Sequence, residues 1–114
     1  WVVSDRFTDA TYAYQGGGRG VPYARLAVLE TWVHDGLQPD LTLLFDVPLA
    51  VSRERLARNT HLDRFEQEQQ TFFSKVQLAY RERAAAYPER IKTLDGTRTI
   101  SDIQEQIKRL LSGL

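Results

Sequence analysis

The apolar run LTLLFDV at residues 41–47 constrains the fold more than any other part of the sequence. It is nearly continuous in apolar residues, which is typical of a strand that is buried on both faces in the centre of a parallel sheet. Pro48 follows at once and favours the start of a helix. Because a parallel sheet needs helices over its faces, this run already predicts an α/β fold.

The segments around this run alternate between strand and helix patterns. Strands are predicted at residues 2–4 and 91–95, and helices at residues 8–15, 23–35, 49–59, 66–87 and from about residue 100 to the end. Thr8 or Asp9 can cap the first of these helices. The wide apolar face of residues 23–35 predicts a helix that is buried on more than one side. The order of elements predicts an α/β domain of three layers around a parallel sheet.

Composition narrows the functional classes. The chain has 114 residues, 42% of them hydrophobic and 11% aromatic, which is enough for the core of one small domain. Fifteen basic residues balance fifteen acidic ones, so overall charge favours neither a nucleic acid nor a membrane as partner. The sequence contains no cysteine, which excludes disulfides and zinc–thiolate sites, and we predict no metal ligands. It shows neither a bilayer-spanning run nor a signal-peptide pattern, so we expect a cytoplasmic protein.

Residues 1–20 place reactive side chains directly after the first predicted strand. Asp5 and Arg6 follow Val2-Val3, and open α/β sheets bind their ligands at the carboxyl ends of strands. The planar guanidinium of Arg6 suits a phosphate or a carboxylate, and Asp5 can orient that group or accept a proton. The alternative is a structural ion pair beside a flexible glycine turn, which an Asp-Arg dipeptide alone favours.

The longer string favours the first interpretation. The motif Asp5-Arg6-Phe7 and the string AYQGGGRG at residues 13–20 closely resemble the thymidylate kinase (dTMP kinase) family, in which DR(Y/F/H) precedes AYQGGGRG. The resemblance implies that Arg6 binds the phosphate of dTMP. For Tyr14 it implies a place against the nucleoside, with core packing as the alternative. The substrate-binding residues implied in this way are Asp5, Arg6, Phe7, Thr11, Tyr14 and Gln15.

An arginine cluster follows the apolar strand, at Arg53, Arg55, Arg58 and Arg64. On a solvated helix such residues form surface ion pairs that contribute little stability. In phosphoryl transfer, arginines that close over the reacting group stabilise the charge on its equatorial oxygens. The cluster and the string LDRFE resemble the LID of bacterial thymidylate kinases that carry catalytic arginines there. The resemblance implies a LID at residues 53–66, with catalytic roles for Arg53, Arg58 and Arg64 rather than Arg55.

The phosphate-binding loop GxxxxGK[ST] does not occur in the sequence. We therefore expect residues 1–114 to be the C-terminal part of one thymidylate kinase domain, an incomplete P-loop kinase fold without the first strands and the P-loop. The complete enzyme would transfer the γ-phosphoryl of ATP to dTMP, giving dTDP, with Mg²⁺ on the donor phosphates. This chain would supply the dTMP site and the LID, and alone it would bind neither ATP nor Mg²⁺ and would be inactive. Arg98, in the loop that meets adenine in the family, is a candidate cofactor contact or an ordinary solvated arginine.

Two other functions stay open. A P-loop kinase for another nucleoside or monophosphate would share the LID arginines but not AYQGGGRG. A non-catalytic kinase-like domain that binds a nucleotide or a protein partner fits the missing P-loop equally well. Family sheets place a further strand between those predicted at residues 2–4 and 41–47. We expect the chain either to close this gap by pairing the two strands directly or to bury the exposed edge by self-association, as a homodimer or a self-associated chain.

Overall fold

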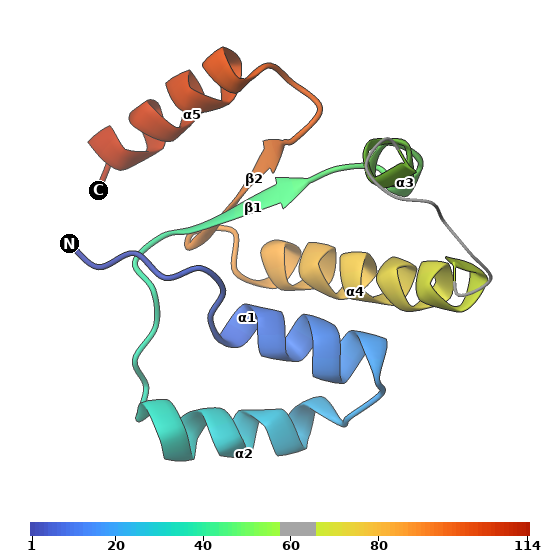
Figure 1. The fold of residues 1–114 in the computed structure, drawn as a ribbon. Helices are drawn as coiled ribbons and strands as arrows, with labels where there is room; N and C mark the ends of the chain where they lie inside the picture. Colours follow the sequence, from blue (N-terminus) through green and yellow to red (C-terminus); the bar gives the residue numbers. More distant parts are fainter. Residues whose placement is uncertain (58–65) are drawn as a thin grey trace.

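The structure, a computed structural model, describes the backbone of residues 1–57 and 66–114 and the side chains of residues 1–55 and 69–114 (Figure 1). Short helical segments and two strands alternate along the chain. In order, the elements are α1 (Thr8–Thr11), the π-helix η1 (Tyr12–Gly18), α2 (Tyr23–His34), β1 (Thr42–Asp46), α3 (Leu49–Ala57), α4 (Glu66–Ala86), β2 (Ile91–Asp95) and α5 (Ile100–Ser112).

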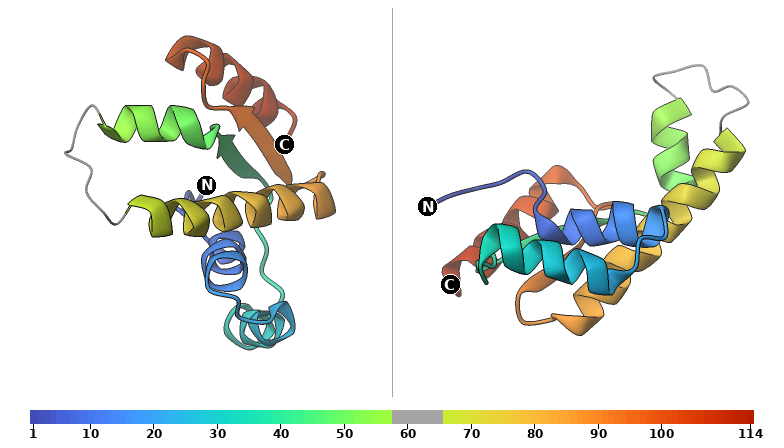
Figure 2. Two further views of the ribbon diagram at one scale, coloured as in Figure 1. Left: turned by 90° about the vertical axis from the view of Figure 1, so that its right-hand side faces the viewer. Right: turned by 90° about the horizontal axis from the view of Figure 1, so that it is seen from below.

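The two strands form a parallel sheet that lies between helices. β1 pairs with β2 in register from Thr42 opposite Ile91 to Asp46 opposite Asp95. Figures 1 and 2 show α5 on one side of the sheet and α4 on the other, with α1–η1 stacked on the far side of α4 and α2 outermost. The sequence prediction of an α/β domain with a parallel sheet is therefore confirmed at this level. Within the described residues, no helix has the length and apolar character needed to cross a membrane.

Most predicted elements lie where the sequence pattern indicates. The apolar run at residues 41–47 contains β1, and the alternating run at residues 91–95 is β2. The long helix before Pro88 is α4, which ends at Ala86 because proline cannot continue it. Thr99 caps α5, since its Oγ1 accepts a hydrogen bond of 3.1 Å from the backbone N–H of Asp102.

The predicted strand at residues 2–4 is wrong. Val2 and Val3 are 96% and 93% exposed, and the sheet that the described residues form contains only β1 and β2. A β-branched run becomes a strand only where a neighbouring strand offers backbone partners and where one face can be buried. Neither condition is met here, so the segment has no regular secondary structure.

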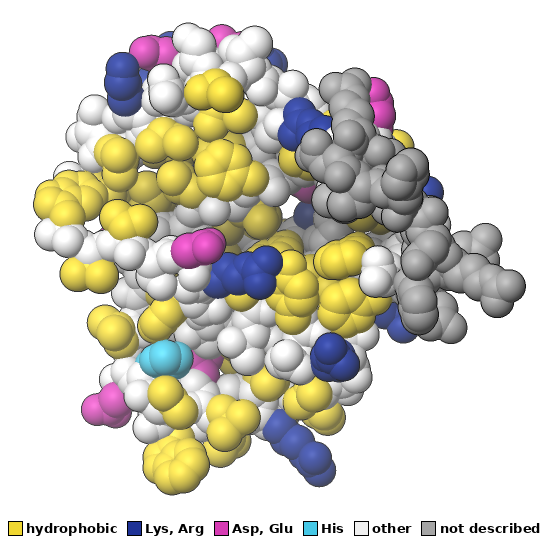
Figure 3. Space-filling model, in the orientation of Figure 1, with side chains coloured by type: hydrophobic (Ala, Val, Ile, Leu, Met, Phe, Trp, Pro, Cys, Tyr) yellow, Lys and Arg dark blue, Asp and Glu magenta, His cyan; other side chains and the backbone are white. Residues whose placement is uncertain are grey.

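The prediction that the second helix is buried on more than one side is also wrong. Leu26 is the one buried side chain of α2, whereas Val28 and Trp32 are 67% and 83% exposed. The reason is the position of α2 as the outermost layer, where η1 covers a single face of it. The apolar pattern therefore faces solvent, and apolar side chains also cover much of the face drawn in Figure 3.

The core lies between η1 and α4. Ala13 of η1 is fully buried against Val76 and Ala79 of α4, and three partly buried aromatic residues surround this centre, namely Tyr14, Phe72 and Tyr80. The small side chains of Ala13 and Ala79 let the two helices approach closely. The segment that contains α1 and η1 is thus packed against α4 rather than against the sheet.

The glycine string is helical, which excludes the flexible glycine turn of the alternative interpretation. η1 runs through Gly16 and Gly17 to Gly18. A Cβ atom on Gly17 would lie 2.5 Å from the Ala79 Cβ and 2.9 Å from the Lys75 carbonyl oxygen, and one on Gly18 would overlap the Phe72 ring. These glycines are needed because the backbone of η1 lies directly against α4, and π-helical turns of this kind are frequent near functional sites.

Candidate functional site

A cleft opens at the carboxyl end of β1. It has a volume of about 310 Å³ and lies between η1, the end of β1, α3 and α4. Its lining is mainly apolar, and the residues that contribute polar groups are Tyr14, Asp46, Ser52, Arg53, Gln70, Gln77, Tyr80 and Arg81. A larger depression of about 650 Å³ lies on the outer face of α2, away from the ends of the strands, and its lining includes Val28 and Trp32. Because open parallel sheets bind ligands at the carboxyl ends of strands, the cleft beside β1 is the candidate site.

Arg6 contacts Tyr14, which lines this cleft. Its side chain is exposed, its Nη2 donates to the Tyr14 hydroxyl at 3.3 Å, and its Cζ is 4.9 Å from the centroid of the Tyr14 ring. The backbone of Arg6 has φ = +66°, a left-handed conformation that costs a residue with a Cβ about 1–2 kcal/mol. Strained residues of this kind are concentrated at ligand sites. The guanidinium therefore faces solvent with donors available to an anion.

Tyr14 joins the core to the cleft. Its ring centroid is 6.1 Å from that of Phe72 and 6.2 Å from that of Tyr80, and it also lines the cleft. Burial raises the pKa of Tyr80, and the neighbouring Tyr14 hydroxyl adds to this rise, so the Tyr80 phenol is neutral at physiological pH. The two interpretations of Tyr14 are compatible, because one edge of the ring packs inward and the other meets the cleft.

The remaining N-terminal candidates do not line the cleft. Asp5 is exposed in the segment before α1, and Thr11 and Gln15 are exposed on α1 and η1. Phe7 is half-buried and packs against the His34 ring at the end of α2, with centroids 4.6 Å apart. Of the six predicted substrate-binding residues, Tyr14 lines the cleft and Arg6 contacts Tyr14.

The candidate arginines of the LID differ in position. Arg53 is exposed on α3 and lines the cleft opposite η1, whereas Arg58 and Arg64 lie outside the described residues. Arg55 donates from both Nη atoms to the Gly96 carbonyl oxygen at 3.2 Å, which ties α3 to the loop after β2. Arg98, in that same loop, is exposed, with its Nε 3.7 Å from Asp95 Oδ2.

Two cleft residues were missed from the sequence. Gln77 donates from Nε2 to Asp46 Oδ1 at 3.2 Å and to the Val47 carbonyl at 2.7 Å. Arg81 donates to both carboxylate oxygens of Asp46 at 3.2 Å. Gln77 and Arg81 are spaced as i and i+4, so the sequence places them on one face of α4. That spacing was the available signal, but it does not reveal that Asp46 lies opposite.

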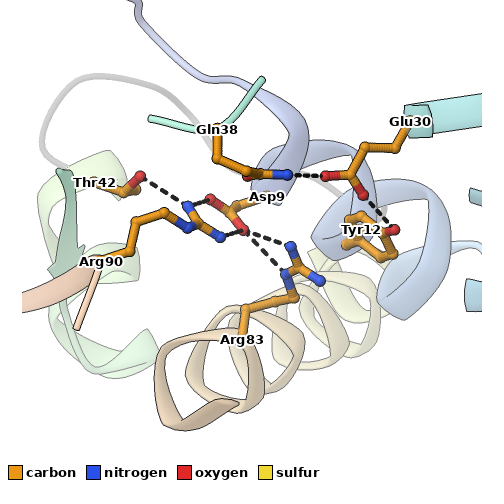
Figure 4. Close-up of polar contacts among 7 residues, drawn as sticks. All are labelled: Asp9, Tyr12, Glu30, Gln38, Thr42, Arg83 and Arg90. Atoms are coloured by element: carbon orange, nitrogen blue, oxygen red, sulfur yellow. Dashed lines mark hydrogen bonds and ion pairs between the residues drawn. The ribbon is translucent and has the colours of Figure 1, made fainter. Parts of the chain in front are cut away.

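A buried polar network connects α1 and η1 with α2, α4 and the residue before β2 (Figure 4). Asp9 is 6% exposed and accepts hydrogen bonds from Arg83 of α4 and from Arg90, the residue before β2. Burial alone would raise the pKa of Asp9, but the hydrogen bonds from Arg90 and Arg83 outweigh it and hold that pKa below its ordinary value. The Tyr12 hydroxyl donates to Glu30 at 2.6 Å, and burial and this bond raise the pKa of Tyr12 to about 12.

The predicted cap of the first helix is therefore wrong. The N-cap residue of α1 is Phe7, which makes no side-chain cap, and the Asp9 carboxylate turns inward to the arginines instead. In the part of the chain that the structure describes, no group of three or more His, Asp or Glu side chains is arranged to hold a metal ion.

Comparison with known proteins identifies the family. Residues 1–107 match the family model for thymidylate kinase. The chain is 55% identical over 114 residues to the thymidylate kinase of Cupriavidus pinatubonensis, covering 100% of this chain and 56% of that protein. It is 54% identical over 112 residues to the thymidylate kinase of Neisseria meningitidis serogroup B, covering 98% of this chain and 54% of that protein. The chain spans about half the length of the curated relatives it matches. The motif at Arg6, the cleft beside β1 and these matches agree, and the chain belongs to the thymidylate kinase family.

Proposed function

We propose that this chain forms the acceptor-nucleotide side of a dTMP kinase, whose complete form transfers the γ-phosphoryl of ATP to dTMP to give dTDP. The observation that carries the proposal is the exposed guanidinium of Arg6, held beside Tyr14, which lines a cleft at the carboxyl end of β1. Relatives of similar sequence are named thymidylate kinases, which supports this choice among phosphate-binding functions.

Each cleft residue has a role that follows from its chemistry. The fork of Arg6 suits the 5′-phosphate of the acceptor, because a planar guanidinium can donate two parallel hydrogen bonds to one phosphate. The Tyr14 ring supplies an aromatic wall for the nucleoside. Arg53, on the opposite wall, is suited to stabilise negative charge during phosphoryl transfer. Asp5, Thr11 and Gln15 remain candidates for further nucleotide contacts, and Arg58 and Arg64 for further LID contacts.

The residues described here do not fit the donor nucleotide. Gly16, Gly17 and Gly18 are helical and packed against α2 and α4, so their N–H groups do not form an open phosphate cradle. In a complete kinase, ATP supplies the phosphoryl group and Mg²⁺ neutralises charge on its phosphates. We therefore assign no phosphate of ATP to this chain, keep Arg98 only as a candidate adenine contact, and expect the chain alone to lack kinase activity.

Two alternatives to dTMP kinase can be separated by binding. A kinase for another acceptor predicts that dAMP, dCMP or dGMP competes with dTMP at equal concentration. A non-catalytic partner-binding domain predicts no saturable binding of any of these nucleotides. Our proposal predicts that dTMP binds and that the other monophosphates compete poorly.

A nucleotide titration of the ¹⁵N-labelled chain tests the proposal. We expect dTMP to shift the resonances of Arg6, Tyr14 and Arg53, and Arg6→Gln to weaken binding by about tenfold or more. Arg25→Gln is the matched control, since Arg25 is an exposed arginine on α2 and its loss changes the net charge equally. The absence of dTMP binding, or equal weakening in the two variants, would refute the proposal.

We also propose that the chain self-associates, in line with the expected homodimer. The exposed apolar residues of α2, with Trp32 at 83% and Val33 at 67% exposure, favour burial against another surface. Light scattering of the purified chain after size-exclusion chromatography tests this, and a monomer at all concentrations would contradict it.

A further inference from the structure

We infer that Asp9 is a positioning residue of the nucleotide site. Asp9 accepts hydrogen bonds from Arg83 and Arg90. These bonds fix the segment α1–η1 on α4 and so determine where Tyr14 lies. This inference rests on the proposed function, because it gives Asp9 a role in building the dTMP site rather than in touching dTMP.

Both oxygens of the Asp9 carboxylate accept hydrogen bonds from arginine side chains. Arg83 donates to Oδ1 from Nε at 3.0 Å and from Nη2 at 2.8 Å. Arg90 donates from Nη1 to Oδ2 at 2.7 Å and from Nη2 to Oδ1 at 3.1 Å. Figure 4 shows the carboxylate between the two guanidinium groups. Oδ1 thus accepts from both arginines and Oδ2 from Arg90, which leaves the carboxylate little freedom to rotate or slide.

The two arginines that bind Asp9 require a negatively charged side chain at this position. Among the residues that the structure describes, Asp9 alone forms ion pairs with the two guanidinium groups, and the side chains of Arg83 and Arg90 are only 12% and 14% exposed. The Arg83 Cζ lies 3.9 Å from the centroid of the Tyr12 ring, which offers a partial counter-charge through its π face. Removing the charge of Asp9 leaves two largely buried cations without their anion, a strongly unfavourable state.

The same two helices carry both this network and the candidate site. Asp9 and Tyr14 lie on the continuous helical segment α1–η1, and Arg83 and Tyr80 lie on α4. The pair Asp9–Arg83 therefore sets how far α1–η1 can slide or turn relative to α4. The distance between the Tyr14 and Tyr80 rings, 6.2 Å, depends on that setting, and so does the Tyr14 hydroxyl that Arg6 contacts.

Arg90 extends the network to the sheet. Its Nη1 also donates to the Thr42 Oγ1 at 3.2 Å, at the start of β1. Asp9 thus connects α1 to α4 and, through Arg90, to the first residue of the strand whose other end borders the cleft. A purely local ion pair would lack this link between the aromatic wall and the strand.

The test uses the 114-residue chain and the variant Asp9→Asn, which keeps the shape of the side chain and removes its charge. We expect the affinity for dTMP to fall by about tenfold. We also expect the nuclear Overhauser contacts between the rings of Tyr14 and Tyr80 to weaken. Leu94→Ala is the control, because Leu94 is 2% exposed in β2 and its truncation also lowers stability without touching the network. At a temperature where each protein is folded, Leu94→Ala should retain dTMP affinity within about twofold and keep the ring contacts.

The outcomes separate this inference from the proposed function. If the unmodified chain binds no dTMP, the proposed function fails and the role of Asp9 fails with it. If the unmodified chain and Asp9→Asn bind dTMP equally and the ring contacts persist, the proposed function stands and the positioning role is refuted. Should Asp9→Asn not fold, Arg90→Lys keeps the charge and removes the fork, and we expect it to weaken dTMP binding by about threefold. Unchanged binding in Arg90→Lys would then refute the role.

Discussion

The substitution Gly17→Ala tests whether the glycine string is a packing device. The new Cβ would lie 2.5 Å from the Ala79 Cβ and 2.9 Å from the Lys75 carbonyl oxygen. Carbon atoms in contact are normally about 3.5–4.0 Å apart, so η1 and α4 would have to separate by about 1 Å. Overpacking of this kind costs about 1–3 kcal/mol, and the higher helix propensity of alanine offsets about 1 kcal/mol of it. Because one of the two close contacts is with a backbone carbonyl, the cost falls in the upper part of this range, about 2–3 kcal/mol, and we expect a net loss of about 1–2 kcal/mol in the free energy of unfolding.

Urea unfolding of Gly17→Ala, with companion variants, measures this loss. Gly113→Ala is the matched control, because its Cβ would meet the nearest atom at 3.6 Å, an ordinary contact, and its stability should stay within about 0.5 kcal/mol of the unmodified chain. The double variant Gly17→Ala with Ala79→Gly removes the contact with Ala79 but not that with Lys75. Glycine at position 79 has its own cost in α4, which the single variant Ala79→Gly measures. The double variant should therefore be more stable than the sum of the two single losses predicts. A Gly17→Ala protein as stable as Gly113→Ala would refute the packing argument.

Three further predictions follow from the polar network and the missing P-loop. The folded pKa of Asp9 lies below its ordinary value of 3.8, so its ionised form stabilises the fold above that pH, and this contribution is lost as the pH falls through the lower folded value. The Asp9→Asn protein should therefore lose less stability than the unmodified chain as the pH falls below about 4, measured by urea unfolding. The raised pKa of Tyr12, about 12, stabilises the fold below about pH 10 and is lost between about pH 10 and pH 12. Tyr12→Phe should flatten that alkaline loss, and an unchanged profile would contradict the assignment. The chain alone should show no dTMP-dependent ADP formation, whereas joining it to the part of the Cupriavidus pinatubonensis relative that it does not cover should give activity; turnover by the chain alone would contradict this prediction.

Local patterns predicted β1, β2 and most helices correctly. β1 and β2 follow from one continuous apolar run and one alternating run, and α4 follows from helical periodicity ended by Pro88. Arg6 and Tyr14 came from the motif that resembles thymidylate kinases, and the structure brings these two residues together. Features that a short stretch of sequence encodes, such as a strand, a helix end or a pair of residues in one motif, could therefore be predicted.

What the sequence could not predict depends on long-range packing. Gly17 is a helical residue because α4 lies against it, although glycine by itself favours turns. Asp9 pairs with Arg83 and Arg90, which are 74 and 81 positions away, so its local pattern indicated only a helix cap. The same limit explains residues 2–4, whose β-branched side chains favour a strand that has no neighbour in the described sheet. The positions of Arg58 and Arg64 lie outside the described residues.

The most direct measurement is the affinity of the chain for dTMP and for thymidine, which differ only in the 5′-phosphate. If Arg6 receives that phosphate, dTMP should bind about tenfold or more tightly than thymidine, since a hydrogen bond to a charged group contributes about 1.5–3 kcal/mol. The preference should disappear in Arg6→Gln and persist in Arg25→Gln. Equal affinity for the two ligands, or a preference that survives Arg6→Gln, would contradict the account.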